Sequence, residues 1–232
     1  MNITEQIKRK RFAPGKGVTE LPPRKGAKRF FFLLTTHPWK LVTLNLLFLL
    51  FSIPVVTIPA AVCGMNRVLI KLVREGNCFL WSDFWQEFKA SFFKAIPFGL
   101  IVAFLLFDSY YALSVSKSGG GILPGALGLF LLGLGVLFGS YSFVLMSALD
   151  LKGSHIARNA LILMATEWKT NLVMIGSIAV TALFIAALFP YTLVLLLFIW
   201  VALQQLIICT AVNETMQRRI IEPFEQSQKK GS

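Results

Sequence analysis

The chain has 232 residues, of which 56% are hydrophobic, and its mean hydropathy is +0.69. A soluble core of this size needs far fewer apolar side chains, so the composition excludes an ordinary soluble domain and indicates an integral membrane protein. The formal net charge is +12, and ten of the 23 basic residues precede Leu41. Because this charged head separates the first apolar run from the amino terminus, we expect that run to stay in the membrane and not to be cleaved as a signal peptide.

Charge and hydropathy divide the chain into three regions. Residues 1–28 are expected to form a flexible, basic cytoplasmic segment. Residues 29–213 are expected to form a single transmembrane domain. Residues 214–232 are expected to form a cytoplasmic tail.

An apolar run between Asn45 and Arg74 is broken by Pro54 and Pro59, and it can be interpreted in two ways. As one helix it carries the chain across the bilayer, whereas as a hairpin it returns the chain to its starting side. Lys and Arg in short loops accumulate on the cytoplasmic side of a membrane. A single crossing would leave twelve later basic residues outside, whereas the hairpin leaves only Lys117 there. The charge distribution therefore favours the hairpin.

The predicted fold class is an all-α, polytopic membrane bundle of six spans with both termini in the cytoplasm. Each apolar run approaches or exceeds the roughly 20 residues that a helix needs to span hydrocarbon, except the second, which is short or re-entrant. The expected location is the bacterial cell membrane. The six spans are predicted near residues 33–53, 58–74, 95–115, 122–149, 171–189 and 191–212.

Two amphipathic stretches, near residues 80–93 and 155–168, are predicted to lie along the cytoplasmic interface. In the first, aromatic residues recur at the three- and four-residue steps of a helix face, while Asp83, Glu87 and Lys89 occupy the remainder. This pattern is typical of an interfacial helix. Because the aromatics share one face and two acids lie opposite, we do not expect nucleic acid as a partner. The interfacial aromatics are Trp81, Phe84, Trp85, Phe88 and Phe92.

The fourth predicted span is rich in glycine. It contains two GxxxG pairs, Gly121 with Gly125 and Gly135 with Gly139. Small residues at this spacing let neighbouring helix backbones approach closely. The two pairs predict packing against another helix of the same chain or, as the alternative, an interface with a partner subunit.

Four polar residues within the predicted spans are candidates for functional contacts. Arg67 lies deep in the second span, and Asp108 is the one acid inside a span, with Lys117 in the loop that follows. Intramembrane charges mark functional sites unless they snorkel or pair, and either of those structural roles is open here. Asn45 and Gln204 are expected either to form hydrogen bonds between helices or to line a polar site.

The sequence contains no recognisable catalytic or metal-binding pattern. Its three cysteines lack CxxC spacing, its two histidines are not spaced from other ligands, and no phosphate-binding loop or nucleophile motif occurs. We therefore expect no catalytic residues, no cofactor and no metal, and we predict that the protein is not an enzyme.

Three segments carry a family resemblance: NLLFLLFSIPVVTIPA at Asn45–Ala60, LIKLVREG at Leu69–Gly76 and FWQEFKASFFKA at Phe84–Ala95. They resemble the YesL-like family of bacterial integral membrane proteins, a domain of unknown function widespread in Gram-positive bacteria. The resemblance covers roughly residues 29–212. Members of this family are often encoded beside carbohydrate-binding lipoproteins, sugar ABC permeases and glycan-degrading enzymes. No catalytic residues are established for the family, so the resemblance implies none here.

Two functional hypotheses follow. The first is a non-enzymatic accessory protein of oligosaccharide uptake, whose partners are the lipid bilayer and either sugar ABC permease subunits or a second copy of the chain. The alternative is a small transporter in its own right, with Arg67, Asp108 and Gln204 lining a polar intramembrane site. The two hypotheses differ in whether these three residues converge.

Overall fold

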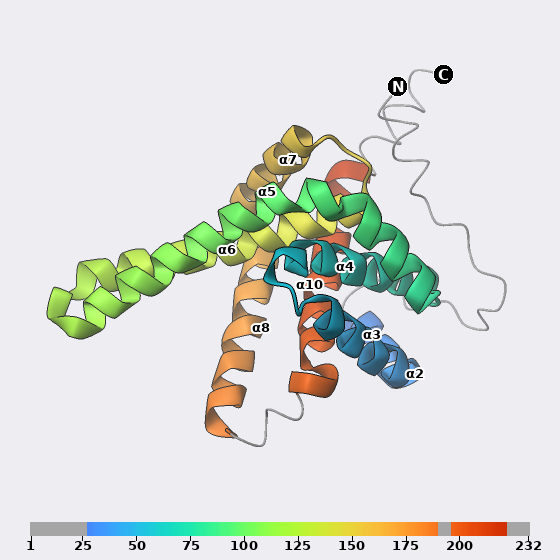
Figure 1. Cartoon of the computed structure of the whole chain (residues 1–232), viewed down its shortest axis with the longest axis horizontal. Coiled ribbons are helices and arrows are strands. Elements are labelled where there is room, and N and C mark those ends of the chain that lie inside the picture. Colours follow the sequence, from blue (N-terminus) through green and yellow to red (C-terminus); the bar gives the residue numbers. More distant parts are fainter. Residues whose placement is uncertain (1–26, 190–195, 222–232) are drawn as a thin grey trace.

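The computed structural model describes residues 27–189 and 196–221, and this part of the chain consists of helices joined by short turns (Figure 1). Most of the basic amino-terminal segment, residues 1–26, lies outside the described residues, as do residues 190–195 and 222–232. Five helical stretches are long and apolar enough to cross a membrane, and a sixth is a bent pair of helices. The all-helical membrane class predicted from the sequence is therefore confirmed, with five or six candidate spans where six were predicted.

The first candidate span is bent and not straight. Helix α2, Ala27–Thr36, and helix α3, Pro38–Phe51, meet at His37 with an angle of 86° between them. Pro38 occupies the first turn of α3, where its missing N–H costs little and its fixed φ favours the start of a new helix. The stretch predicted as a span near residues 33–53 is therefore divided between two helices at this point.

Helices α3 and α4 form an antiparallel hairpin. The 3₁₀ turn η1, Val55–Thr57, leads into α4, Ile58–Glu75. Oγ1 of Thr57 donates a hydrogen bond to the carbonyl oxygen of Phe51 at 2.5 Å, which closes the turn. At the open end, Nε2 of His37 lies 2.9 Å from the carbonyl oxygen of Gly76. The start of α3 therefore lies beside the end of α4.

The predicted interfacial stretch and the third predicted span belong to one helix. Helix α5 runs without interruption from Leu80 to Val115 and carries Pro97 in its interior. The expectation of a separate interfacial helix over residues 80–93 is therefore corrected. The change from an amphipathic to an apolar pattern marks a change of surroundings, not the end of a helix.

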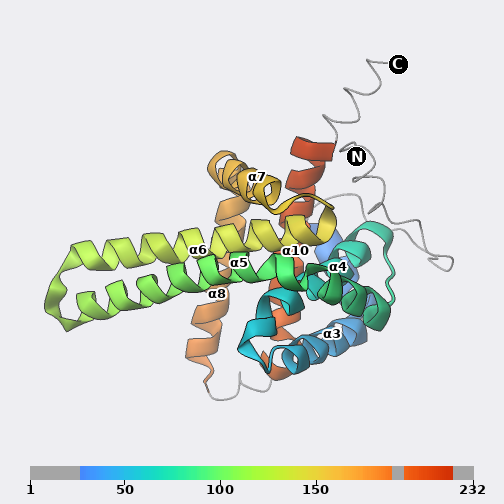
Figure 2. The same ribbon diagram turned by 45° about the horizontal axis from the view of Figure 1, so that its top comes forward.

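Helices α5 and α6 form a long hairpin that projects from the body of the molecule in both ribbon views (Figures 1 and 2). They are joined by the π-helical turn η2, Ser116–Gly120, and α6 extends over Ile122–Ala148. Gly119 and Gly121 have φ angles of 95° and 84°, which favour glycine because it lacks a Cβ. We call the part of this hairpin beyond Gly99 and Gly139 the arm.

After α6, the described chain contains one short helix followed by two longer apolar helices. Helix α7, Gly153–Thr166, precedes α8, Trp168–Ala187. After residues 190–195, the chain continues as the π-helical turn η3, Leu196–Trp200, and helix α10, Val201–Met216, which passes into the turn η4, Gln217–Ile221. The helical backbone therefore continues into the region predicted as a tail from residue 214.

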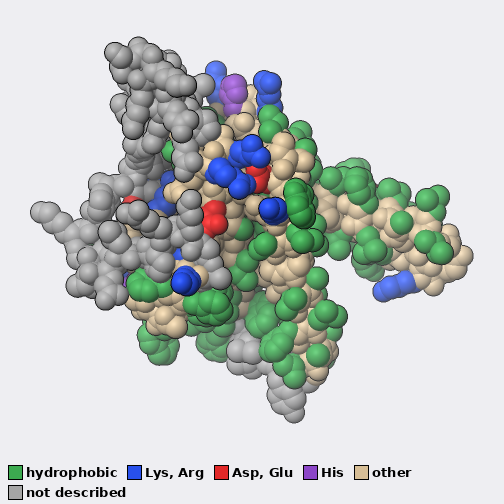
Figure 3. Space-filling view, turned by 180° about the vertical axis from the view of Figure 1, so that it is seen from behind, with side chains coloured by type: hydrophobic (Ala, Val, Ile, Leu, Met, Phe, Trp, Pro, Cys, Tyr) green, Lys and Arg blue, Asp and Glu red, His purple; other side chains and the backbone are tan. Residues whose placement is uncertain are grey.

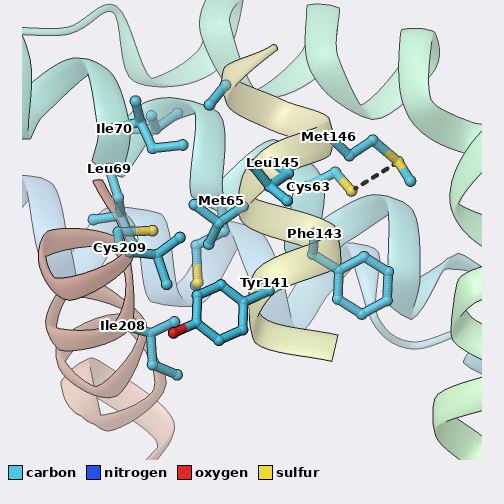
Figure 4. Close-up of a cluster of buried hydrophobic side chains, with 14 of the residues drawn as sticks. Cys63, Met65, Leu69, Ile70, Tyr141, Phe143, Leu145, Met146, Ile208 and Cys209 are labelled. Atoms are coloured by element: carbon cyan, nitrogen blue, oxygen red, sulfur yellow. Dashed lines mark hydrogen bonds between the residues drawn. The ribbon is translucent and has the colours of Figure 1, made fainter. Parts of the chain in front are cut away.

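The core lies where α4, α6 and α10 meet (Figure 4). Among the candidate spans, the stretch Val55–Glu75, which contains α4, has the largest buried share, at 56%. Among the fully buried side chains, Tyr141 is one of the largest, and the Sγ of Cys63 lies 3.7 Å from the Sδ of Met146. The short second span of the sequence-based prediction is thus the central helix of the body.

Candidate functional site

Two charged pairs join the central helix α4 to the first half of α5. Nζ of Lys71 lies 2.8 Å from Oδ1 of Asp83, and Nε of Arg67 lies 3.9 Å from Oε2 of Glu87. The two bases are four residues apart on α4 and the two acids are four residues apart on α5. Residues at this spacing share one face of a helix, so the antiparallel helices present matching rows of opposite charge. We call these four residues the ionic ladder.

Further hydrogen bonds fix both acids of the ionic ladder. Oδ2 of Asp83 accepts the backbone N–H of Phe79 at 2.9 Å, which satisfies a donor at the start of α5. Oε1 of Glu87 accepts the hydroxyl of Ser91 at 2.5 Å. Asp83 is 8% exposed and Glu87 is 4% exposed, so both carboxylates lie inside the protein. Buried charges need such partners, because their loss of hydration is otherwise uncompensated.

The ladder is also bound to α6. Nη1 of Arg67 donates to the carbonyl oxygen of Ser147 at 3.2 Å, and the hydroxyl of Ser147 donates to the carbonyl oxygen of Cys63 at 2.9 Å. Arg67 therefore connects α4 with both α5 and α6. Its depth in the predicted second span is explained by pairing within the chain, which was one of the two interpretations left open by the sequence.

The aromatic residues on the first half of α5 differ in how deeply they are buried. Phe84 and Phe88 are buried, and both rings lie beside Phe51 of α3, with centroids 5.5 and 5.2 Å away. Trp81 is 60% exposed, and Trp85 and Phe92 are partly buried. The acids do not form a solvated back opposite the aromatics, as the sequence suggested, because they face α4. Only some of the predicted interfacial aromatics are thus available to a membrane surface.

Other polar contacts gather at the same end of the helices as the ladder. Lys40 donates to the side-chain oxygen of Asn77, and Nε of Arg74 donates to Oδ1 of Asn213 at 2.8 Å. The 4% exposed Glu167 is bound by both Arg218 and Arg219 near the end of the described chain. Figure 3 shows basic and acidic side chains close together on the body, whereas the surface of the arm is mainly hydrophobic. Charge is therefore concentrated at one end of the molecule.

Asn45 and Gln204 form hydrogen bonds between helices. Oδ1 of the buried Asn45 accepts the backbone N–H of Ala202 at 2.9 Å and so joins α3 to α10. Nε2 of Gln204 donates to the hydroxyl of Ser177, and its Oε1 accepts the hydroxyl of Thr181, both at 2.9 Å. The structural interpretation of these two residues fits the observed contacts.

Asp108 lies on the arm, away from the other three candidates. Its side chain is half-buried on α5, and in the described chain it forms neither an ion pair nor a hydrogen bond, including none with Lys117. Arg67 contacts Glu87 and Ser147, whereas Gln204 contacts residues of α8. The structure therefore does not bring Arg67, Asp108 and Gln204 together.

The glycines of α6 mostly serve the hairpin. A Cβ at Gly135 would lie 3.3 Å from Leu105 and one at Gly139 would lie 3.2 Å from Val102, while Gly125 faces Ser116. These three glycines allow α5 to approach α6 closely, as small residues do in membrane helices. Gly121 instead forms the turn. Of the two interpretations of these glycines, packing within the chain fits the observed contacts. The face that Gly135 and Gly139 share is occupied by α5.

Sequence reasoning missed Asp83 and Glu87 as members of the candidate site. The signal was present, because bases at positions 67 and 71 and acids at positions 83 and 87 have the same four-residue spacing on consecutive helices. Two rows of charges with this spacing pair only when their helices pack side by side in one register. Helix packing supplies that register, and the acids then become buried partners.

The chemistry of the site is that of fixed charge pairs. Among residues 27–189 and 196–221, no group of three or more His, Cys, Asp or Glu side chains is placed to hold a metal ion. Cys63 and Cys209 are buried, and burial raises the pKa of the Cys78 thiol, in the loop before α5, to about 11. This pKa keeps Cys78 in its unreactive, protonated form at neutral pH.

One family model matches the chain. It is described as "Protein of unknown function, DUF624" and matches residues 41–112, less than half of the chain. The match extends from α3 through α4 and along most of α5, and it therefore includes the whole ionic ladder. No curated protein and no solved structure matches the chain.

Proposed function

We propose that this chain is a non-enzymatic accessory protein of an oligosaccharide ABC uptake system in a bacterial cell membrane. Its body would hold the helices in one arrangement through the ionic ladder, and its apolar arm would dock against other membrane subunits. Both termini, together with the charged end of the molecule, would lie in the cytoplasm.

The observation that carries the proposal is the pairing of the polar side chains inside the body. Arg67, Lys71 and Gln204 each contact other residues of this chain. Side chains held in such contacts stabilise a helix arrangement, whereas a transport path needs polar groups that converge on a substrate. The body thus favours a scaffold, and the exposed apolar side chains of the arm favour contacts within the membrane.

The carbohydrate part of the proposal rests on the YesL-like resemblance and on the genes that often lie beside those of family members. The DUF624 match over residues 41–112 supports the resemblance in the region where all three of its segments lie. The cytoplasmic side is inferred from the basic residues, because every described Lys and Arg except Lys117 lies on the body and not on the arm.

Copurification tests this proposal directly. The full chain carrying a carboxy-terminal affinity tag is crosslinked in native membranes, purified and analysed by mass spectrometry. We expect a permease subunit of a sugar ABC system to be enriched over a parallel purification of an unrelated tagged six-span protein. Recovery of no transport subunit in repeated experiments would refute the accessory role.

The transporter alternative can be tested on the purified chain alone. Proteoliposomes that contain only this protein should take up no radiolabelled oligosaccharide, with or without a proton gradient, if the accessory role is correct. Saturable uptake that is lost in R67Q or Q204A but kept in K117Q would favour the alternative.

A further inference from the structure

We propose that Asp108 is a recognition site for a transmembrane helix of another membrane protein that carries an Arg or Lys at the matching depth. This inference deepens the proposed docking role, because it names the chemistry of the partner helix and the residue that selects it. It does not depend on the partner being a sugar permease.

The position of Asp108 places it in the membrane part of the arm. It lies eight residues before the turn at Ser116, which corresponds to about 12 Å along an α-helix. With the tip at one surface of the hydrocarbon core, which is about 30 Å thick, a carboxylate at this distance lies inside the hydrocarbon. The arm projects from the body in both ribbon views, and its tip is far from α4 (Figures 1 and 2).

The surroundings of Asp108 are apolar and unpartnered. Nearby on α5, Phe104, Phe107 and Tyr111 are 65%, 67% and 66% exposed, so large side chains around the acid do not pack within the described chain. The carboxylate makes no ion pair or hydrogen bond with any described residue, and the nearest base along the arm, Lys117, does not reach it. A single acid is thus presented on an otherwise apolar surface.

Charge decides which occupant fits this surface. An ionised carboxylate facing lipid is costly, and acids in transmembrane segments usually pair with a base or accept hydrogen bonds. Lipid tails and a purely apolar helix offer neither. A helix with one Arg or Lys supplies the opposite charge, while the exposed aromatic side chains of the arm supply van der Waals contacts along its length.

The test uses designed helices in place of the unidentified partner. A synthetic 21-residue Leu/Ala membrane helix carries one Arg eight residues from its end, and its twin carries Gln at that position. The full-length chain, labelled at its carboxy terminus, is reconstituted in phosphatidylcholine vesicles, and binding of each labelled helix is measured by energy transfer. We expect the Arg helix to bind at least fivefold more tightly than the Gln helix.

Two variants of Asp108 complete the test. D108N, which keeps the shape of the side chain, should bind the Arg and Gln helices equally, and D108R should instead prefer a helix with Glu at the same depth. The control K117Q changes a charge on the same hairpin and should retain the preference for Arg. Circular dichroism and the elution volume of each variant show that it folds.

Several results would overturn this inference. One is equal binding of the Arg and Gln helices to the natural chain, and another is an unchanged preference in D108N. A third is energy transfer between two labelled copies of the chain that is lost in D108N, which would make a second copy the occupant. If the Arg helix binds through Asp108 but no sugar permease copurifies, the docking site stands and the carbohydrate role falls.

Discussion

Nζ of Lys71 on α4 lies 2.8 Å from Oδ1 of Asp83 on α5, and this ion pair sets the register of the two helices. One helical turn away, Arg67 approaches Glu87 in the same relation. A shift of α5 by one residue would rotate both acids away from α4, because successive residues on a helix point about 100° apart. The pairs therefore specify one packing of α4 against α5 as well as stabilising it.

Removal of the Asp83 charge is expected to destabilise the body. D83N keeps an acceptor for the N–H of Phe79 but removes the carboxylate that lies 2.8 Å from Nζ of Lys71, and both side chains are less than a third exposed. Breaking one partner of such a buried pair costs about 3 kcal/mol. The measurement is the free energy of unfolding in mixed micelles titrated with sodium dodecyl sulfate.

The double variant K71M/D83N separates two effects: the loss of the ion pair itself and the cost of burying one charge without its partner. Because a buried ammonium that has lost its carboxylate partner is costly, the double variant should be more stable than D83N alone. The control K89Q removes an exposed base on the same helix and should change stability by no more than about 0.5 kcal/mol. Equal losses in D83N and K89Q would contradict this account of the pair.

Two glycine substitutions are expected to act in opposite directions. A Cβ at Gly99 would lie 2.3 Å from the ring of Pro59, so G99A must push α5 away from the start of α4. Overpacking of this kind costs about 2 kcal/mol. No atom lies within 4 Å of a Cβ at Gly133, so G133A should instead stabilise α6 by up to about 1 kcal/mol through its helix propensity. The same unfolding titration compares both variants, and a stable G99A would refute the close approach.

The thiol of Cys78 is expected to react slowly with alkylating reagents near neutral pH. Burial disfavours the thiolate and raises the pKa to about 11, so the reactive fraction at pH 8 is about 0.1%, against about a quarter for a thiol of pKa 8.5. The rate with N-ethylmaleimide should rise about tenfold per pH unit up to pH 10. Peptide mapping by mass spectrometry distinguishes Cys78 from Cys63 and Cys209, and a rate that levels off below pH 9.5 would show that the thiol is not buried as described.

Loss of the carboxylate of Glu167 is expected to release the end of α10. In E167Q, Arg218 and Arg219 lose their shared anionic partner, so the turn Gln217–Ile221 should open more often. Limited trypsin digestion in detergent should then cut after these two arginines several times faster. The control D150N removes a half-exposed acid that pairs with Lys94 at 3.9 Å and should leave this cleavage rate unchanged. Equal cleavage in E167Q and the natural chain would contradict the anchoring role.

The hydropathy of the sequence was sufficient to predict the helices because apolar runs near 20 residues have few other structures in a membrane. Two boundaries escaped it. The break at His37 is marked only by Pro38 and the short polar stretch Thr35–Lys40, and the continuity of α5 across Phe93 is hidden by a change in side-chain pattern. Helix formation depends on the local backbone, so a pattern that reflects surroundings gives no boundary by itself.

The pairing of the candidate site could not be predicted from the sequence in the same way. Arg67 and Asp108 are both charges in apolar runs, yet one is bound by α5 and α6 whereas the other makes no ion pair or hydrogen bond with the described residues. This difference arises from packing between distant segments. The spacing of Asp83 and Glu87 was a usable signal, but it becomes a prediction only when the antiparallel orientation of α4 and α5 is known.

The contact between Pro59 and Gly99 determines how far each hairpin reaches. Gly99 lies 16 residues before the end of α5, or about 24 Å along the helix, so the turn between α3 and α4 stops that far short of the tip of the arm. A bilayer with one surface at the tip and its plane perpendicular to the arm would contain the arm but only the outermost turn of α4, so α4 would then be a helix of the body and not a full span. Glu87, about 42 Å from that tip, would then lie beyond the hydrocarbon together with Arg67. In that placement Arg67 would not be a charge of the lipid interior, and its contacts with Glu87 and Ser147 would join helices of the body outside the hydrocarbon.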